Sequence, residues 1–173
     1  GDVYKRQELI EVVECLKKEF EKKDLDKIKF CLGLQIENLS NGILVHQSTY
    51  TEKILKRFYM DNSHPLSTPM VVRSLDINTD PFRPQENDEE LLGDETPYLS
   101  AIGALMYLAN NTRPDICFAV SLLARFSSSP TKRHWNGVKH ILRYLRGTMD
   151  MSLFYSNESK SETDWLHRCW IFI

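Results

Sequence analysis

The sequence predicts an α+β fold in which a small antiparallel hairpin precedes a bundle of helices. Apolar residues alternate along residues 27–37, which is the period of a strand with one buried face. After residue 96 they recur instead at helical spacing in three consecutive segments. Between these parts, residues 61–96 lack periodicity and hold four prolines and nine acidic residues against two arginines. We therefore expect a disordered acidic loop between the two parts.

The first part of the chain contains signals for two helices and one hairpin. Residues 8–20 place apolar residues at helical spacing, with lysine and glutamate on the other face. The pair Asn41-Gly42 is typical of a hairpin turn, and residues 43–47 are expected to return as the partner strand. The run TYTE at 49–52 has the pattern of a capping box. It predicts a helix with these inward residues: Tyr50, Ile54, Leu55 and Phe58.

In the second part, breaks at NNTRP and SSSP predict helices over residues 97–108, 114–126 and 131–146, followed by a short strand at 153–155. At the second helix Thr112 can act as the cap, Pro114 suits the first turn, and Asp115 suits the positive helix end. Arg113 can pair with Asp115 or reach a phosphate, and both alternatives stay open. Four aromatic residues fall at helical spacing with apolar partners, and most of them are expected in the core: Tyr98, Tyr107, Trp135 and Tyr144.

A basic stripe is predicted on the third of these helices. Residues 97–147 carry seven basic residues against a single acid, Asp115. At ~100° per residue, one line along the helix holds Lys132, Lys139, Arg143 and Arg146. About a quarter-turn away lies an apolar stripe expected to face the core: Trp135, Val138, Leu142 and Leu145. This arrangement favours contact with a nucleic-acid backbone, and a solvated basic face is the alternative.

Other kinds of site are not indicated. The four cysteines are far apart, which argues against a disulfide framework or a zinc site and favours reduced intracellular thiols. No apolar run reaches the ~18 residues that a membrane span needs, so no membrane partner is expected. His134 and His140 would lie on different helix faces and could not chelate one metal. His46, at a strand end, could touch a phosphate or be structural.

Four motifs together resemble a known family. They are FCLGLQI at 30–36, the run AIGALMYLANNTRPDICFAV at 101–120, HW at 134–135 and RYLRGT at 143–148. In combination they resemble the C-terminal part of the reverse transcriptase in copia-type LTR-retrotransposon Pol polyproteins. The resemblance covers residues 8–162. It implies these parts: a distal palm fragment with a primer-grip-like hairpin (8–47), a first thumb helix (48–60), an acidic flexible loop (61–96), and a basic helical thumb and connection (97–155).

The resemblance implies a non-catalytic part of an RNA-directed DNA polymerase, which grips the primer–template behind the polymerase site. The family's Tyr-x-Asp-Asp carboxylates, which hold two metal ions, would lie before Glu8. No cofactor is therefore expected here, although the parent enzyme would use Mg²⁺. A small non-enzymatic protein derived from it, binding nucleic acid or a partner, is the alternative. The candidate contacts to an RNA–DNA or DNA duplex backbone are Lys132, Lys139, Arg143, Arg146, Arg113 and His46.

The resemblance also names the rest of the parent polyprotein as partners: an N-terminal palm with fingers, and a C-terminal RNase H. The parent element would work in a cytoplasmic particle and in the nucleus. Because earlier palm strands would precede the hairpin, residues 28–45 are expected to leave sheet edges and an apolar face uncovered.

Both ends of the chain have unusual sequences. The heptapeptide at 1–7 resembles a translated sequencing adapter and is excluded from the fold prediction. Residues 156–173 are interpreted as a linker and tail. With one codon choice, a reading frame shifted by one base turns residues 163–173 into LIGYIDAGYL, which resembles the first RNase H strand of the family. We therefore hypothesise a frameshifted tail, with a true apolar C-terminal strand as the alternative.

Overall fold

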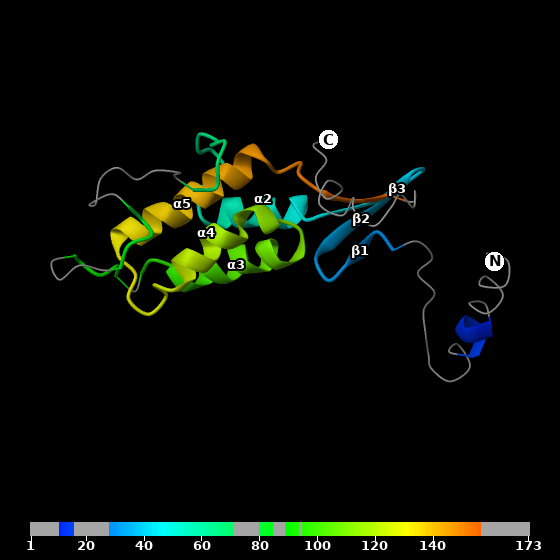
Figure 1. The fold of residues 1–173 in the computed structure, drawn as a ribbon, viewed down its shortest axis with the longest axis horizontal. Coiled ribbons are helices and arrows are strands. Elements are labelled where there is room, and N and C mark those ends of the chain that lie inside the picture. Colours follow the sequence, from blue (N-terminus) through cyan, green and yellow to red (C-terminus); the bar gives the residue numbers. More distant parts are fainter. Residues whose placement is uncertain (1–10, 16–27, 71–79, 85–88, 94, 157–173) are drawn as a thin grey trace, which may run out of the picture.

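The computed structural model describes residues 11–15, 28–70, 80–84, 89–93 and 95–156. A small sheet lies at one end of a body of helices (Figure 1), so the α+β prediction is confirmed. The elements follow in this order: β1 (Phe30–Cys31), β2 (Leu34–Leu39), β3 (Gly42–His46), α2 (Ser48–Arg57), α3 (Tyr98–Asn111), the 3₁₀-helix η1 (Pro114–Ile116), α4 (Cys117–Ala124), α5 (Lys132–Gly147) and β4 (Leu153–Ser156).

The sheet is antiparallel throughout, with strand order β1-β2-β3-β4. The predicted hairpin forms with Leu39 opposite Gly42, so Ser40 and Asn41 make the turn. On the other side of β3, Ile43 pairs with Tyr155 of β4. The last described strand thus returns across the molecule to the first hairpin. The expectation of uncovered edges is therefore wrong for β3, because β4 supplies its second partner.

One predicted strand, at residues 27–37, is broken in two. Leu32 and Gly33 have φ angles of 49° and 79°, so the chain turns there and β1 pairs back on β2. The hydroxyl of Tyr107 on α3 donates to the Leu32 carbonyl. A β-carbon added at Gly33 would lie 2.7 Å from the Tyr107 hydroxyl oxygen, so glycine is required by both φ and space. The apolar alternation continues through this turn, which is why the pattern predicted one strand.

The core lies between the four helices. The predicted inward residues of α2 are buried or packed against this core, and Tyr98 and Tyr144 are buried as expected. Trp135 is partly buried against the same cluster. Fully buried side chains come from all three later helices: Leu105, Leu108, Leu123, Ile141, Leu142 and Leu145. The helical periodicity therefore identified the correct faces.

The beginning of α2 differs from the predicted capping box at 49–52. The helix begins at Ser48, and no side chain of its own cap residue, Gln47, bonds to it. Instead Gln35 on β2 accepts hydrogen bonds from the Thr49 N–H (2.9 Å) and from the Ser48 hydroxyl (3.2 Å). A residue distant in sequence thus satisfies a helix N–H group that the local pattern assigned to Thr49.

The predicted helix at 114–126 consists of η1 followed by α4. Pro114 occupies the first turn as expected. The expected cap is wrong, since Arg113 holds the cap position and its side chain makes no capping hydrogen bond to a helix N–H. The Thr112 hydroxyl donates instead to Gln47 Oε1 at 2.8 Å, joining the end of α3 to the start of α2.

The acidic segment contacts α5 along its length. We call its described residues (61–70, 80–84 and 89–93) the strap. The Leu66 N–H donates to the Arg143 carbonyl at 3.2 Å, and the Leu92 N–H donates to the Pro130 carbonyl at 2.7 Å. The strap therefore differs from the loop without fixed contacts that its composition predicted, because α5 and the residues just before it supply backbone partners that composition does not reveal.

Several predictions concern residues outside the described ranges. Of the predicted helix at 8–20, residues 11–15 are helical, and Val12 is exposed. The heptapeptide 1–7 and the tail 163–173 lie outside the described residues. The adapter and frameshift hypotheses stay predictions.

Candidate nucleic-acid interface

Helix α5 presents two opposite faces. Its buried residues cover a wide arc: Arg133, His134, Gly137, Val138, Ile141, Leu142, Tyr144 and Leu145. The predicted basic stripe is centred about half a turn from the centre of this arc, so it faces away from the core. Lys132 is exposed, and Lys139, Arg143 and Arg146 are half-buried. The helix thus carries its free cations and its core contacts on different faces.

The two lysines of the stripe are available for a ligand. Within the described part of the chain, neither Lys132 nor Lys139 forms a hydrogen bond or an ion pair. They stand seven residues apart, so about 10 Å separates them along the helix axis. Two ammonium groups arranged in this way can contact phosphates along one backbone.

The two arginines of the stripe are bound to the strap. Arg143 Nε donates to the His64 carbonyl at 2.8 Å, and Arg146 Nη1 donates to the Ser63 carbonyl. Both acceptors are neutral main-chain groups. The structure therefore divides the predicted stripe into a free pair of lysines and a pair of arginines already in use.

Three more α5 side chains donate to the strap, and the sequence patterns predicted none of these contacts. Arg133 reaches the Asp80 carbonyl (2.9 Å), the Pro84 carbonyl (3.2 Å) and the Glu89 carboxylate (2.7 Å). The Nε2 atoms of two histidines donate to carbonyls: His134 to Arg83 (2.9 Å) and His140 to Thr68 (3.1 Å). No sequence signal indicated these contacts, since all the acceptors except the Glu89 carboxylate are main-chain carbonyls that every residue type provides.

The protonation of His134 is defined by its neighbours. Its Nδ1 accepts the Thr131 N–H at 3.0 Å, which caps α5, so the ring proton lies on Nε2. Phe126 stacks on the ring at 4.1 Å. Burial lowers the pKa of His134, and burial also lowers the pKa of His140. Both rings therefore favour the neutral form in the folded protein.

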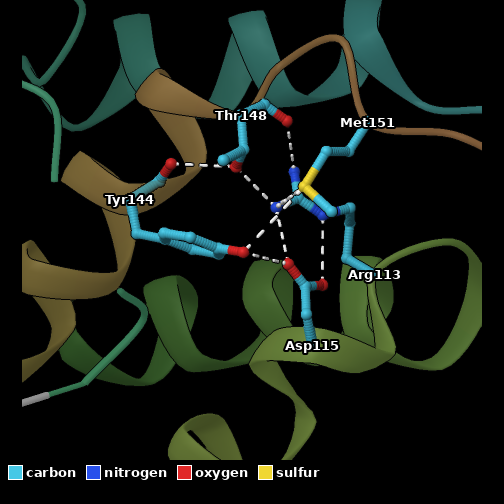
Figure 2. Close-up of polar contacts among 5 residues, drawn as sticks. All are labelled: Arg113, Asp115, Tyr144, Thr148 and Met151. Atoms are coloured by element: carbon cyan, nitrogen blue, oxygen red, sulfur yellow. Dashed lines mark hydrogen bonds and ion pairs between the residues drawn. The ribbon is translucent and has the colours of Figure 1, made fainter. Parts of the chain in front are cut away.

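Arg113 lies in a buried polar network instead of at the surface (Figure 2). Its Nε and Nη2 donate to the two carboxylate oxygens of Asp115 at 3.1 and 2.8 Å. Its Nη1 reaches the Thr148 carbonyl at 2.8 Å, and the Tyr144 hydroxyl donates to Asp115 at 2.8 Å. Of the two alternatives that the sequence left open, the geometry favours the Asp115 pair. The network joins η1 to the end of α5.

His46 is held at the junction of β3 and α2. Its Nδ1 lies 2.9 Å from the Ser48 hydroxyl, and its Nε2 lies 3.2 Å from Glu37 Oε1. Only about a tenth of its side chain is exposed. A phosphate contact by His46 stays a prediction, and any such ligand would compete with Glu37.

Sequence comparisons with known proteins identify relatives of this chain. The sequence profile described as reverse transcriptase (RNA-dependent DNA polymerase) matches residues 4–72. The retrovirus-related Pol polyprotein from transposon TNT 1-94 of Nicotiana tabacum is 42% identical over 136 residues, which are 77% of this chain and 10% of that protein. The chain belongs to the copia-type retrotransposon Pol family.

Other relatives of this Pol family member differ in length. The Pol polyprotein from transposon RE2 of Arabidopsis thaliana is 33% identical over 159 residues, covering 88% of this chain and 10% of that protein. This chain thus spans about a tenth of the length of these polyproteins. The uncharacterized mitochondrial protein AtMg00810 of Arabidopsis thaliana is 31% identical over 153 residues, covering 84% of this chain and 59% of that protein. No solved structure matches the chain.

Two further observations concern the described residues of this Pol family member. They contain no group of three or more His, Cys, Asp or Glu side chains arranged to hold a metal ion. None of their helices is long and apolar enough to cross a membrane.

Proposed function

We propose that the chain is the part of a retrotransposon RNA-directed DNA polymerase that holds the primer–template and does not itself carry out polymerisation. The observation that carries the proposal is the pair Lys132 and Lys139, which lies on the outward face of α5 without partners among the described residues. Membership of the Pol family supplies the ligand class. An RNA–DNA duplex presents a regular line of phosphates, and lysines contact these without reading base sequence.

The non-catalytic part of the proposal rests on the carboxylates. Nucleotide transfer by two metal ions requires carboxylates held close together. The printed sequence has no adjacent pair of aspartates. Among the described acids, Asp115 is paired with Arg113 and Glu89 with Arg133. These residues do not fit the Mg²⁺ pair that a complete polymerase would bind, so this chain contributes binding to the reaction.

Fluorescence anisotropy with a labelled RNA–DNA duplex tests the binding. The double variant Lys132→Ala/Lys139→Ala should reduce the slope of log K against log salt by about two, since each lysine neutralises about one phosphate. The matched control is Lys53→Ala/Arg57→Ala, which removes the same charge from two exposed positions on α2. Equal slopes for the two double variants would contradict the proposal.

A primer-extension assay with Mg²⁺ and deoxynucleotides tests whether the chain itself carries out polymerisation. The chain alone should add no nucleotide to a primer annealed to RNA. Extension above a no-protein control would show that this chain holds a polymerase site of its own.

A further inference from the structure

The first part of the strap lies on the basic stripe of α5, and its later part crosses toward the start of the helix. Strap residues run antiparallel to the helix, since their contacts proceed from the end of α5 toward its start. Ser63 and His64 meet Arg146 and Arg143. Further along the strap, Thr68 meets His140, and residues 80–84 meet Arg133 and His134. At the far end, Leu91 forms a bridge with Thr131.

We propose that residues 61–68 of the strap mask half of the nucleic-acid-binding face of α5, and that a bound duplex displaces them. This inference rests on the proposed function. In the closed state Lys132 and Lys139 are available and the strap occupies Arg143 and Arg146. In the open state all four cations contact the phosphate backbone. The strap therefore acts as an internal competitor for the duplex.

The anchoring of the strap shows which part can leave. Met60, Met70, Phe82 and Leu92 pack against the hydrophobic core, and Glu89 forms an ion pair with Arg133. No residue between Met60 and Met70 belongs to this core or packs against it. Residues 61–68 are thus a span fastened at both ends and attached to α5 only by hydrogen bonds and surface contacts, so its opening exposes little apolar surface.

The chemistry of the acceptors favours exchange. Arg143 and Arg146 donate to neutral carbonyls in the closed state. A phosphate offers charged oxygens to the same donors, and hydrogen bonds between two charged groups are roughly twice as strong as neutral ones. The released carbonyls of Ser63 and His64 gain water, since His64 is exposed and Ser63 is half-buried. When phosphate replaces these carbonyls as the acceptor for the two arginines, few polar groups are therefore left without a hydrogen bond.

Gly147 offers a way to displace the span without changing any charge. A β-carbon there would lie 3.1 Å from Pro65 Cβ and 3.2 Å from the Leu66 carbonyl. The variant Gly147→Leu should therefore push residues 65–66 away from α5. Gly103→Leu is the matched control, since a β-carbon at Gly103 meets nothing within 4 Å. A second variant, Pro65→Ala/Leu66→Ala, weakens the same contact from the strap side and leaves α5 intact.

The experiment measures duplex affinity and its salt dependence for the full chain and these variants. Gly147→Leu and Pro65→Ala/Leu66→Ala should each bind an RNA–DNA duplex roughly threefold more tightly or better, with a salt slope steeper by up to about two. Gly103→Leu should match the parent chain. Hydrogen exchange supplies a direct readout: adding duplex to the parent chain should accelerate exchange of the Leu66 amide, which the Arg143 carbonyl protects.

Two failures are distinguishable. If the parent chain binds duplex through Lys132 and Lys139 but the Leu66 amide exchanges no faster in the complex, the masking inference is overturned and the proposed function stands. If neither the parent chain nor either strap variant binds duplex with salt dependence, the proposed function and the inference fall together.

Discussion

The helical body and the sheet differ in how completely they bury their apolar residues. Leu105 and Leu142 in the body are 0% exposed, whereas Phe30 and Leu32 at the sheet edge are 67% and 87% exposed. Burial of apolar side chains therefore stabilises the helical body strongly and the edge of the sheet much less. The sheet depends on ties to the body, such as the Gln35 cap on α2 and the Tyr107 contact to Leu32.

The largest expected difference between the two regions is in hydrogen exchange. Amides of α3 and α5 should exchange only through global unfolding, because their helices surround the core. Amides of β1 and β2 should exchange through local opening, whose free energy should be a few kcal/mol below that of global unfolding. Native-state exchange followed by mass spectrometry measures both. Uniform protection across sheet and body would show that the two regions unfold as one unit.

Removing Arg113 should produce the next largest effect. Arg113→Ala leaves the Asp115 carboxylate, which is 15% exposed, with only the Tyr144 hydroxyl, so we expect a loss of about 3 kcal/mol in the free energy of unfolding. Arg125→Ala removes an exposed arginine and should cost within about 0.5 kcal/mol. Urea denaturation of both variants gives the comparison. A small loss at Arg113 would show that the network adds little to the link between η1 and α5.

Truncating an apolar side chain to alanine should cost more stability in the helical body than in the sheet. Leu105→Ala opens a cavity in the core and should cost about 2–5 kcal/mol. Ile43→Ala in β3 removes a side chain that is 39% exposed and should cost about 1 kcal/mol or less. Denaturation midpoints at constant slope report both values. A cost at Ile43 equal to that at Leu105 would mean that the sheet face is covered in solution.

The smallest effect concerns pH. Burial lowers the folded-state pKa of His134 and of His140, so the unfolded chain binds more protons than the folded chain as pH falls. Their contribution to stability is present above a pH of about 6.5 and is lost progressively below it. His134→Gln should flatten this dependence between pH 7.5 and 5.5, measured by thermal unfolding.

The matched control for this pH effect is His64→Gln, since His64 is exposed and offers α5 its carbonyl, not its ring. A parent chain whose stability rises as pH falls from 7.5 to 5.5 would contradict the assignment of His134 and His140 as neutral donors to the strap.

Local patterns predicted the secondary structure well and its junctions poorly. The helix at 131–146 is observed as Lys132–Gly147, because sixteen residues of amphipathic spacing define a face. The strand at 27–37 failed because its alternation continued through the turn at Leu32 and Gly33. The cap at Thr49 failed because Gln35, on another element, supplies the acceptor.

At the candidate site, too, local patterns predicted some features, and long-range contacts decided the others. The line of four cations on α5 was predictable, since a helix places residues at these spacings on one side. Their unequal availability was not, because Ser63 and His64 approach Arg146 and Arg143 from about eighty residues away. Arg113 is the clearest case: its pairing with Asp115 was one of two alternatives, the other being a phosphate contact, and its bond to Thr148 is long-range.

The sequence by itself determined the class of fold, the faces of the helices, the family and the presence of a cationic stripe. Each of these depends on periodicity or on short motifs, and both are local properties of a chain. Tertiary structure alone decided that β4 completes the sheet, that the acidic segment lies on α5, and which cations stay free. Those outcomes depend on backbone carbonyls and amides, which every residue carries, so only their positions in space distinguish one partner from another.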